Sequence, residues 1–290
     1  MPDAAVLYPG EMGCAVARLL VGAGWRVVTH LWGPSLVCRA DAEAAGVVDL
    51  ASLDDAVAAS DVVIALVPPS AALSTAEVAA AAARRRTRRP LYLDGNSVSP
   101  GTMAAVATAC ESSGLDCVDG SFIGSAADLG GRTRLYLSGP RADELAALLP
   151  AALHVRAAGP EVGSASALKL AFAGFNKGLV ALFLAVVDAG IVAGEPDELL
   201  DCLRAFYPGT IETLERLLPT YPRHVARRAE ELDELAGWLT RNGSDAGWAT
   251  AARDVLERLA ALGLEARPGW TFADVLEAWT SRRPPSGAPS

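Results

Sequence analysis

The chain has 290 residues, of which 51% are hydrophobic, and a formal net charge of −9. This length is enough for one large or two medium domains. The negative charge argues against nucleic acid or an anionic membrane surface as a partner. The five cysteines show neither CxxC spacing nor a histidine-rich neighbourhood, so we expect no metal site and no disulfide framework. Together with the lack of a signal-peptide pattern, this predicts a cytoplasmic protein.

Short apolar runs alternate with alanine-rich helical segments through the first 160 or so residues. The continuous apolar run at 61–67 is typical of a central parallel strand that is buried on both faces. The alternation of strand and helix predicts a doubly wound parallel α/β sheet of the Rossmann type at 1–162. Its strands are expected at 4–7, 25–31, 61–67, 90–94, 115–119 and 133–138.

The strand pattern stops after residue 160, and the segment 163–194 is typical of one long helix with Ser164 as its N-cap. The segment 197–280 contains further helical stretches separated by Pro-Gly and Asn-Gly turns. We therefore predict an all-α domain at 163–283 that begins with a long interdomain helix, followed by a flexible tail at 284–290. Because polar residues interrupt the long helix, we expect it to be buried in protein and not to span a membrane.

The segment AVLYPGEMGCAVARLL lies between the first strand and the first helix. Gly10 and Gly13 match the second and third glycines of a GxGxxG loop, in which the backbone approaches a pyrophosphate and the helix N-terminus donates amides to it. Tyr8 stands in the place of the first glycine and weakens the match. The residues of this loop that we expect to bind a cofactor are Pro9, Gly10, Glu11, Met12 and Gly13.

The end of the second predicted strand bears on which dinucleotide the loop prefers. NAD-preferring domains usually carry an acid there, about twenty residues after the loop, to bind the ribose diol. The sequence VVTHLWGPSLVCRA has no acid before Asp41. Ser35 and Arg39 could bind a 2′-phosphate instead. The sequence therefore predicts a preference for NADP(H) over NAD(H).

The chain contains 23 arginines and only two lysines, both within ALKLAFAGFNKG on the predicted long helix. A lysine in an apolar setting can exchange a proton near neutral pH, which arginine cannot. Lys169 is thus the candidate proton donor and acceptor, with a snorkelling amine as the alternative. Lys177 could be functional, snorkelling or an interface charge. Asn176 lies about 10 Å from Lys169 on the same helix face, where it could bind the substrate or a neighbouring helix.

Five segments in order resemble the β-hydroxyacid dehydrogenase and 6-phosphogluconate dehydrogenase superfamily over nearly the whole chain: YPGEMG, LVPP, LDGNSVSP, CVDGSFIGSAAD and GSASALKLAFAGFNKG. The resemblance implies a homodimer and a catalytic role for Lys169. It places Val67, Pro68 and Asn96 at the cofactor. It implies substrate contacts for Ser97, Ile123, Gly124, Ser125 and Asn176. The stretch YPRHVARRAEELDELA is similar to a phosphogluconate-dehydrogenase-like subgroup with a short helical C-terminal domain.

Two departures from the family narrow the expected reaction. Asn176 stands where the members that decarboxylate sugar phosphates carry an acid, which argues against that reaction. Ile123 replaces a common serine, which indicates a less polar substrate. We therefore expect an NADPH-dependent oxidoreductase that transfers a hydride between nicotinamide and a carbonyl or secondary alcohol of a small, hydroxyacid-like molecule.

Two other functions remain open on the sequence. An imine reductase on the same fold is favoured by Ile123, but Lys169 is atypical of those enzymes. A non-catalytic nucleotide-binding protein is favoured by Tyr8 in place of a glycine. The basic cluster at 223–228 could hold an anionic substrate in a neighbouring cleft or form a solvated helix face.

Overall fold

The computed structural model describes residues 2–31, 36–84, 89–265, 267 and 269–281. The chain divides into two compact units, Met1–Lys169 and Leu170–Ser290, each with its own hydrophobic core. The division falls inside the long helix, whereas the sequence-based boundary lies at its start. The predicted tail at 284–290 lies outside the described residues.

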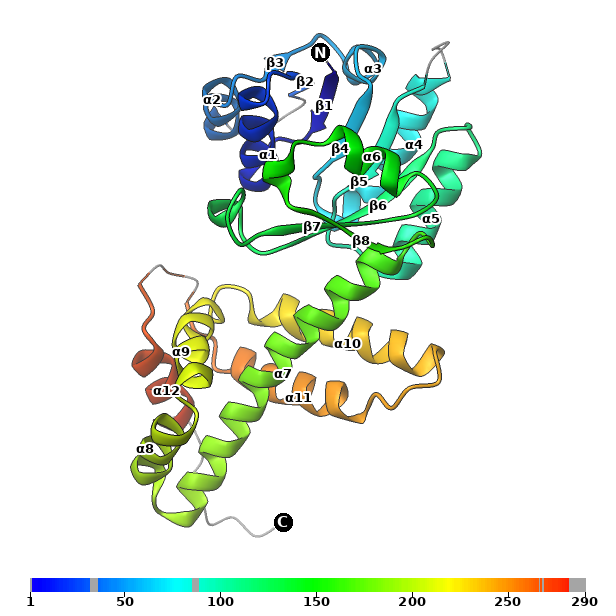
Figure 1. Ribbon diagram of the computed structural model, residues 1–290. Helices are drawn as coiled ribbons and strands as arrows, with labels where there is room; N and C mark the ends of the chain where they lie inside the picture. Colours follow the sequence, from blue (N-terminus) through cyan, green and yellow to red (C-terminus); the bar gives the residue numbers. More distant parts are fainter. Residues whose placement is uncertain (1, 32–35, 85–88, 266, 268, 282–290) are drawn as a thin grey trace. The chain divides into compact units, whose positions relative to one another are not determined.

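The first unit is built on an eight-stranded sheet (Figure 1) in the order β3-β2-β1-β4-β5-β6-β7-β8. The central strands are buried on both faces, which is why their sequences are continuous apolar runs. This architecture confirms the predicted Rossmann-type domain. The strands are β1 (Asp3–Leu7), β2 (Arg26–Thr29), β3 (Val48–Asp49), β4 (Val62–Ala65), β5 (Leu91–Asp94), β6 (Cys117–Ile123), β7 (Arg134–Ser138) and β8 (Val155–Gly159).

The sheet differs from the sequence-based expectation in two respects. Strand β7 runs antiparallel to β6, because the connection at 124–133 contains only one short 3₁₀ helix, and a parallel crossover needs a longer, usually helical segment. Strands β3 and β8 were not expected from the sequence. Strand β3 has only two residues, and β8 reads VRAAG without an apolar alternation.

Helices cover both faces of the sheet because side chains alternate along each strand. In β1, Ala4 and Val6 pack against α1 and α6, while Ala5 and Leu7 join the core beneath α3, α4 and α5. The helices of this unit are α1 (Glu11–Gly22), α2 (Leu36–Ala44), α3 (Leu53–Ala58), α4 (Ala72–Ala83), α5 (Pro100–Glu111) and α6 (Ala142–Leu148). Three short 3₁₀ helices complete it: η1 (Pro69–Ala71), η2 (Ala126–Asp128) and η3 (Ala151–Leu153).

The second unit is helical, as the sequence predicts. The long helix α7 (Ser164–Ala193) begins in the first unit and continues into the second. Gly174 of α7 has no room for a side chain, because a Cβ there would lie 2.2 Å from Leu235 Cδ2. The remaining helices are α8 (Pro196–Phe206), α9 (Pro208–Leu217), η4 (Leu218–Thr220), α10 (Val225–Arg241), α11 (Gly247–Ala261) and α12 (Phe272–Ser281).

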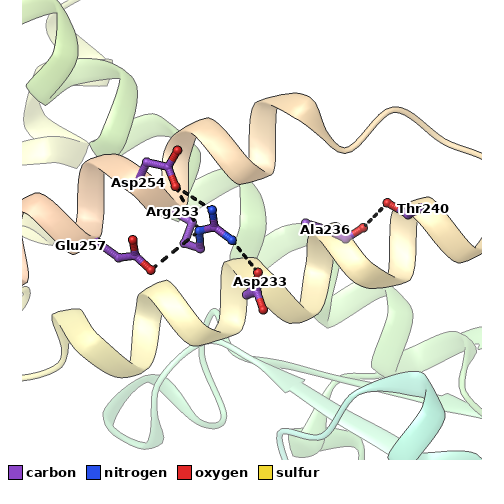
Figure 2. A network of polar contacts seen from close by, with 6 residues as sticks. All are labelled: Asp233, Ala236, Thr240, Arg253, Asp254 and Glu257. Atoms are coloured by element: carbon purple, nitrogen blue, oxygen red, sulfur yellow. Dashed lines mark hydrogen bonds and ion pairs between the residues drawn. The ribbon is translucent and has the colours of Figure 1, made fainter.

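Helices α10 and α11 are joined by polar contacts as well as by the core (Figure 2). Arg253 of α11 forms ion pairs with Asp233 of α10 at 2.8 Å, and with Asp254 and Glu257 of its own helix. The three carboxylates are exposed to solvent and Arg253 is partly exposed, and ion pairs at the surface contribute little to stability. The apolar side chains between the helices therefore hold this pair together.

Within the described part of the chain, α7 is the one helix that is long and apolar enough to cross a membrane. Length and composition alone do not separate a membrane span from a core helix. Several side chains of α7, among them Val180, Phe183 and Leu184, are buried in the core of the second unit. Over its most apolar window, however, only 39% of the residues are buried, so α7 is partly a core helix, and the expected burial of the whole helix stays a prediction.

Candidate functional site

The loop between β1 and α1 forms a tight turn that presents backbone amides at the start of α1. Tyr8 adopts φ +58°, the left-handed conformation for which glycine is the usual residue and which costs other residues about 1–2 kcal/mol. Its carbonyl accepts a hydrogen bond from Gly10 N at 2.8 Å. A Cβ on Gly13 would lie 3.1 Å from Tyr8 O. Tyr8 thus supplies the turn normally made by the first glycine, and the loop keeps its predicted shape.

This loop borders a cavity of about 700 Å³ at the carboxyl ends of β1, β2 and β4. The predicted residues Pro9, Gly10, Val67 and Pro68 all line it, so the structure brings them together. The side chains of Glu11 and Met12 do not line it: Glu11 is exposed and Met12 packs against the core. The other lining residues are Leu7, Tyr8, His30, Leu31, Leu53, Ala71, Ser74, Thr75 and Val78.

At the end of β2, a carboxylate that sequence reasoning missed lies beside the cavity. Thr29 of β2 pairs with Asp49 of β3, and Asp49 Oδ1 accepts a hydrogen bond from Leu31 N at 2.9 Å. The predicted phosphate ligand Arg39 forms an ion pair with Asp49 at 3.2 Å and donates to Leu31 O at 2.7 Å. The other predicted phosphate ligand, Ser35, lies outside the described residues.

At the end of β5, Asp94 and Asn96 form a buried polar pair. The Asp94 carboxylate accepts hydrogen bonds from Asn96 N at 3.1 Å and from Asn96 Nδ2 at 3.0 Å. Burial raises the pKa of Asp94 to about 6, against the opposing effects of the Asn96 bonds and the Lys169 charge. Among the described residues, no donor reaches Asn96 Oδ1, which is buried. Asn96 therefore offers one acceptor oxygen to a ligand.

The start of α7 is anchored to the sheet by a second buried acid, Asp119 of β6. Its carboxylate accepts hydrogen bonds from Ser138 Oγ, Gly163 N, Ser166 N and Ser166 Oγ at 2.7–3.0 Å. Ala165 N donates to Ser138 Oγ at 3.0 Å. An acceptor-only group fits these donors, and a negative charge suits a helix N-terminus. Asp119 thus takes over the role of an N-cap.

This anchor decides the position of Lys169. Helix α7 begins at Ser164 and Ala167 N donates to Gly163 O, so residue 163 holds the N-cap position that the sequence assigned to Ser164. Lys169 follows in the second turn, is partly buried, and lies close enough to lower the pKa of Asp94. The first unit therefore brings Lys169 and the Asp94–Asn96 pair into one electrostatic neighbourhood.

The predicted substrate loop follows β6. Ile123 ends the strand and is partly exposed, and Gly124 has φ +136°. A Cβ on Gly124 would lie 2.1 Å from Thr133 Oγ1. Ser125 Oγ caps η2 by accepting from Asp128 N at 3.2 Å. The hydroxyl of Ser125 thus has a structural partner, while Ser97, which follows Asn96, is exposed.

In the second unit, Lys177 has a structural explanation. Its Nζ lies 2.8 Å from Glu231 Oε2 and donates to Ala173 O. Burial lowers the pKa of Lys177, and Glu231 opposes that effect. Asn176 is partly buried on the same helix. In the basic cluster, Arg228 lies 4.0 Å from the centre of the Tyr221 ring. Lys177 is therefore a buried ion-pair partner in this unit.

The glycine loop, its cavity and the lysine beside buried polar groups define an NAD(P)-dependent dehydrogenase or reductase. More specifically, the chain belongs to the family of the NAD-binding domain of 6-phosphogluconate dehydrogenase, which matches residues 5–151. A domain of unknown function, DUF1932, matches residues 193–259. Among curated proteins, none matches the chain.

Solved structures share the fold of this chain over nearly its whole length. A conserved hypothetical protein from Sinorhizobium meliloti is 26% identical, with 98% of this chain and 97% of that chain covered and a TM-score of 0.74. The 3-hydroxyisobutyrate dehydrogenase of Mycobacterium tuberculosis is 20% identical, with 98% and 100% covered and a TM-score of 0.74. An imine reductase from Myxococcus stipitatus, in complex with NAD⁺, is 19% identical, with 96% and 99% covered and a TM-score of 0.61. The last two likenesses establish the fold.

Proposed function

We propose that this protein is an NADP(H)-dependent oxidoreductase that interconverts a carbonyl and a secondary alcohol of a small, hydroxyacid-like molecule. One observation supports this proposal above all. The first unit holds both the dinucleotide loop and Lys169, and it places Lys169 near a buried acid–amide pair. Such a lysine can exchange a proton with a substrate hydroxyl.

Different residues of the first unit would bind the cofactor, transfer the proton and orient the substrate in this reaction. The nicotinamide, when bound, supplies or accepts the hydride. The glycine loop and the start of α1 would bind the pyrophosphate, since their amides and the tight approach at Gly10 and Gly13 fit it. Lys169 gives or takes the hydroxyl proton. Asn96 and Ser97 orient the reacting groups, and the backbone at Gly124 contacts the substrate.

The preference for NADP(H) over NAD(H) is supported by the cation near the end of β2. Arg39 donates to Leu31 O, and Leu31 lines the cavity, so a guanidinium lies next to the cavity, where Asp49 also contacts it. The strand β2 itself ends in Thr29 without an acid. These features favour a 2′-phosphate over a free ribose diol.

Imine reduction is the second candidate, and Ile123 favours it. This apolar side chain ends β6 where the substrate loop begins, and it offers no donor to a carboxylate. An imine reductase also shares the fold. Lys169 argues against this candidate, because a lysine at this position of the helix is atypical of imine reductases.

A substrate panel tests the proposal. Purified protein would be mixed with NADPH or NADH and with ketones, β-ketoacids or cyclic imines, and with NADP⁺ and β-hydroxyacids for the reverse direction. We expect nucleotide turnover with an oxygen substrate, faster with NADP(H), measured as absorbance at 340 nm. Turnover of imines alone would favour the second candidate. If fluorescence titration showed that neither NADPH nor NADH binds, the proposed function would be contradicted.

We also propose that the partner of this chain is a second copy of itself. The second unit has an apolar groove of about 640 Å³ lined by α7 and α11. Phe175 and Leu182 of α7 and Trp248 of α11 are 66%, 63% and 48% exposed, and exposed apolar patches of this kind commonly mark interfaces. Sedimentation velocity should give about twice the chain mass of 29.9 kDa. We expect Leu182→Arg to give monomers, whereas a monomeric wild type would contradict the proposal.

A further inference from the structure

The cavity rim at the end of β2 carries one cation and one carboxylate in direct contact. The Arg39 guanidinium and the Asp49 carboxylate lie 3.2 Å apart, and both form hydrogen bonds with the backbone of Leu31. Asp49 Oδ1 accepts from Leu31 N at 2.9 Å, and Arg39 Nη2 donates to Leu31 O at 2.7 Å. Because Leu31 lines the dinucleotide cavity, this pair lies next to the region where the adenosine ribose of a bound dinucleotide would lie.

The pair affects the two nucleotides differently. A phosphate monoester carries about 1.5 to 2 negative charges at pH 7 and binds the planar fork of arginine strongly. Asp49 occupies the Nη1 side of that fork and repels a second anion. Arg39 and Asp49 are 42% and 39% exposed in their side chains, so a ligand can reach them and solvent screens them only in part. NAD(H) carries no 2′-phosphate and does not compete for Arg39.

We propose that Asp49 weakens the preference of this protein for NADP(H), because it competes with the 2′-phosphate for Arg39. The inference rests on the proposed dinucleotide binding. It names a residue of β3, and not of β2, as the determinant of specificity. The charge of Asp49 lowers the selectivity for NADP(H), and removal of that charge is expected to raise the selectivity.

The test uses Asp49→Asn in the full-length protein. Asparagine keeps a side-chain oxygen for Leu31 N but loses the charge that holds Arg39. We expect affinity for NADPH and for the fragment 2′,5′-ADP to rise about tenfold, and affinity for NADH and 5′-AMP to change less than about twofold. Fluorescence titration measures the two dinucleotides, and calorimetry measures the two fragments.

Two further variants make the test specific. Arg39→Met should weaken NADPH binding about tenfold and leave NADH binding nearly unchanged. In the double variant the gain from Asp49→Asn should disappear, since there is no guanidinium left to release. Asp143→Asn, on the exposed face of α6, changes the net charge of the protein by the same amount. It should alter neither the affinity for NADPH nor the affinity for NADH. It controls for the overall charge of the protein.

The outcomes separate the two proposals. Equal effects of Asp49→Asn on NADPH and NADH, or a gain that persists without Arg39, would overturn the role of Asp49 while dinucleotide binding stands. Binding of none of the four nucleotides to the wild type would overturn the proposed function and this inference together. The unchanged NADH affinity of each variant also shows that the site is still folded.

Discussion

Replacing Lys169 by methionine is expected to lower turnover at least about 100-fold and to leave the affinity for NADPH nearly intact. The side chain keeps its length but loses the amine that exchanges a proton with the substrate, and such a group typically contributes 10²- to 10⁴-fold, as an order of magnitude, to the rate. Lys169 does not line the dinucleotide cavity, so binding is spared. Initial rates on the best substrate of the panel, with fluorescence titration of NADPH, measure both quantities.

The other lysine provides a matched control. Lys177→Met removes a buried amine paired with Glu231, so we expect a lower midpoint of thermal unfolding, because Glu231 loses its partner. The rate per folded molecule should stay within about threefold. Undiminished turnover in the Lys169 variant, or an equal loss in both variants, would remove Lys169 from the mechanism.

Replacing Asp119 by asparagine is expected to destabilise the protein by about 3–5 kcal/mol, the usual effect of breaking a buried charged network. The carboxylate accepts four hydrogen bonds. In the asparagine variant an amide NH₂ group replaces one carboxylate oxygen. This group is itself a hydrogen-bond donor, so it cannot accept the bonds that the oxygen accepted. Denaturant unfolding followed by circular dichroism measures the loss, and the anchoring of α7 makes reduced activity a further expected result.

The exposed variant Asp143→Asn serves as the control here too. It lies on the surface of α6 in the same unit, and it should change the free energy of unfolding by less than about 1 kcal/mol. Recovery of only insoluble Asp119→Asn protein, with a soluble control, would agree with the prediction. A loss below about 1 kcal/mol at Asp119 would contradict the proposed anchor.

The local features of this chain were predictable because they depend on neighbouring residues. Continuous apolar runs gave the central strands, the glycines after β1 gave the dinucleotide loop, and the uninterrupted helical pattern gave α7 within a residue at each end. The family resemblance suggested the site residues for the same reason, since each motif that supports it is a short segment of neighbouring residues. Tyr8 was the exception, and the backbone shows that it adopts the turn conformation of a glycine.

The features that decide the site depend on residues far apart in the chain. The sequence did not indicate an acid near the end of β2, because Asp49 belongs to the neighbouring strand β3. Asp119 caps a helix that begins 45 residues later, at Ser164. Asp119 ended a strand expected from the sequence at 115–119, which was the one signal available for it, whereas Asp49 ends β3, a two-residue strand that the sequence did not predict.

The sequence by itself determined six of the eight strands of the first unit, the loop for a dinucleotide and the two lysines of α7. Only the tertiary structure decided the direction of β7, the ion pair of Arg39 with Asp49, and the different surroundings of Lys169 and Lys177. The physical reason is that strand pairing and burial join side chains across the sheet or between helices. Periodicity and turn residues report only on the backbone near them.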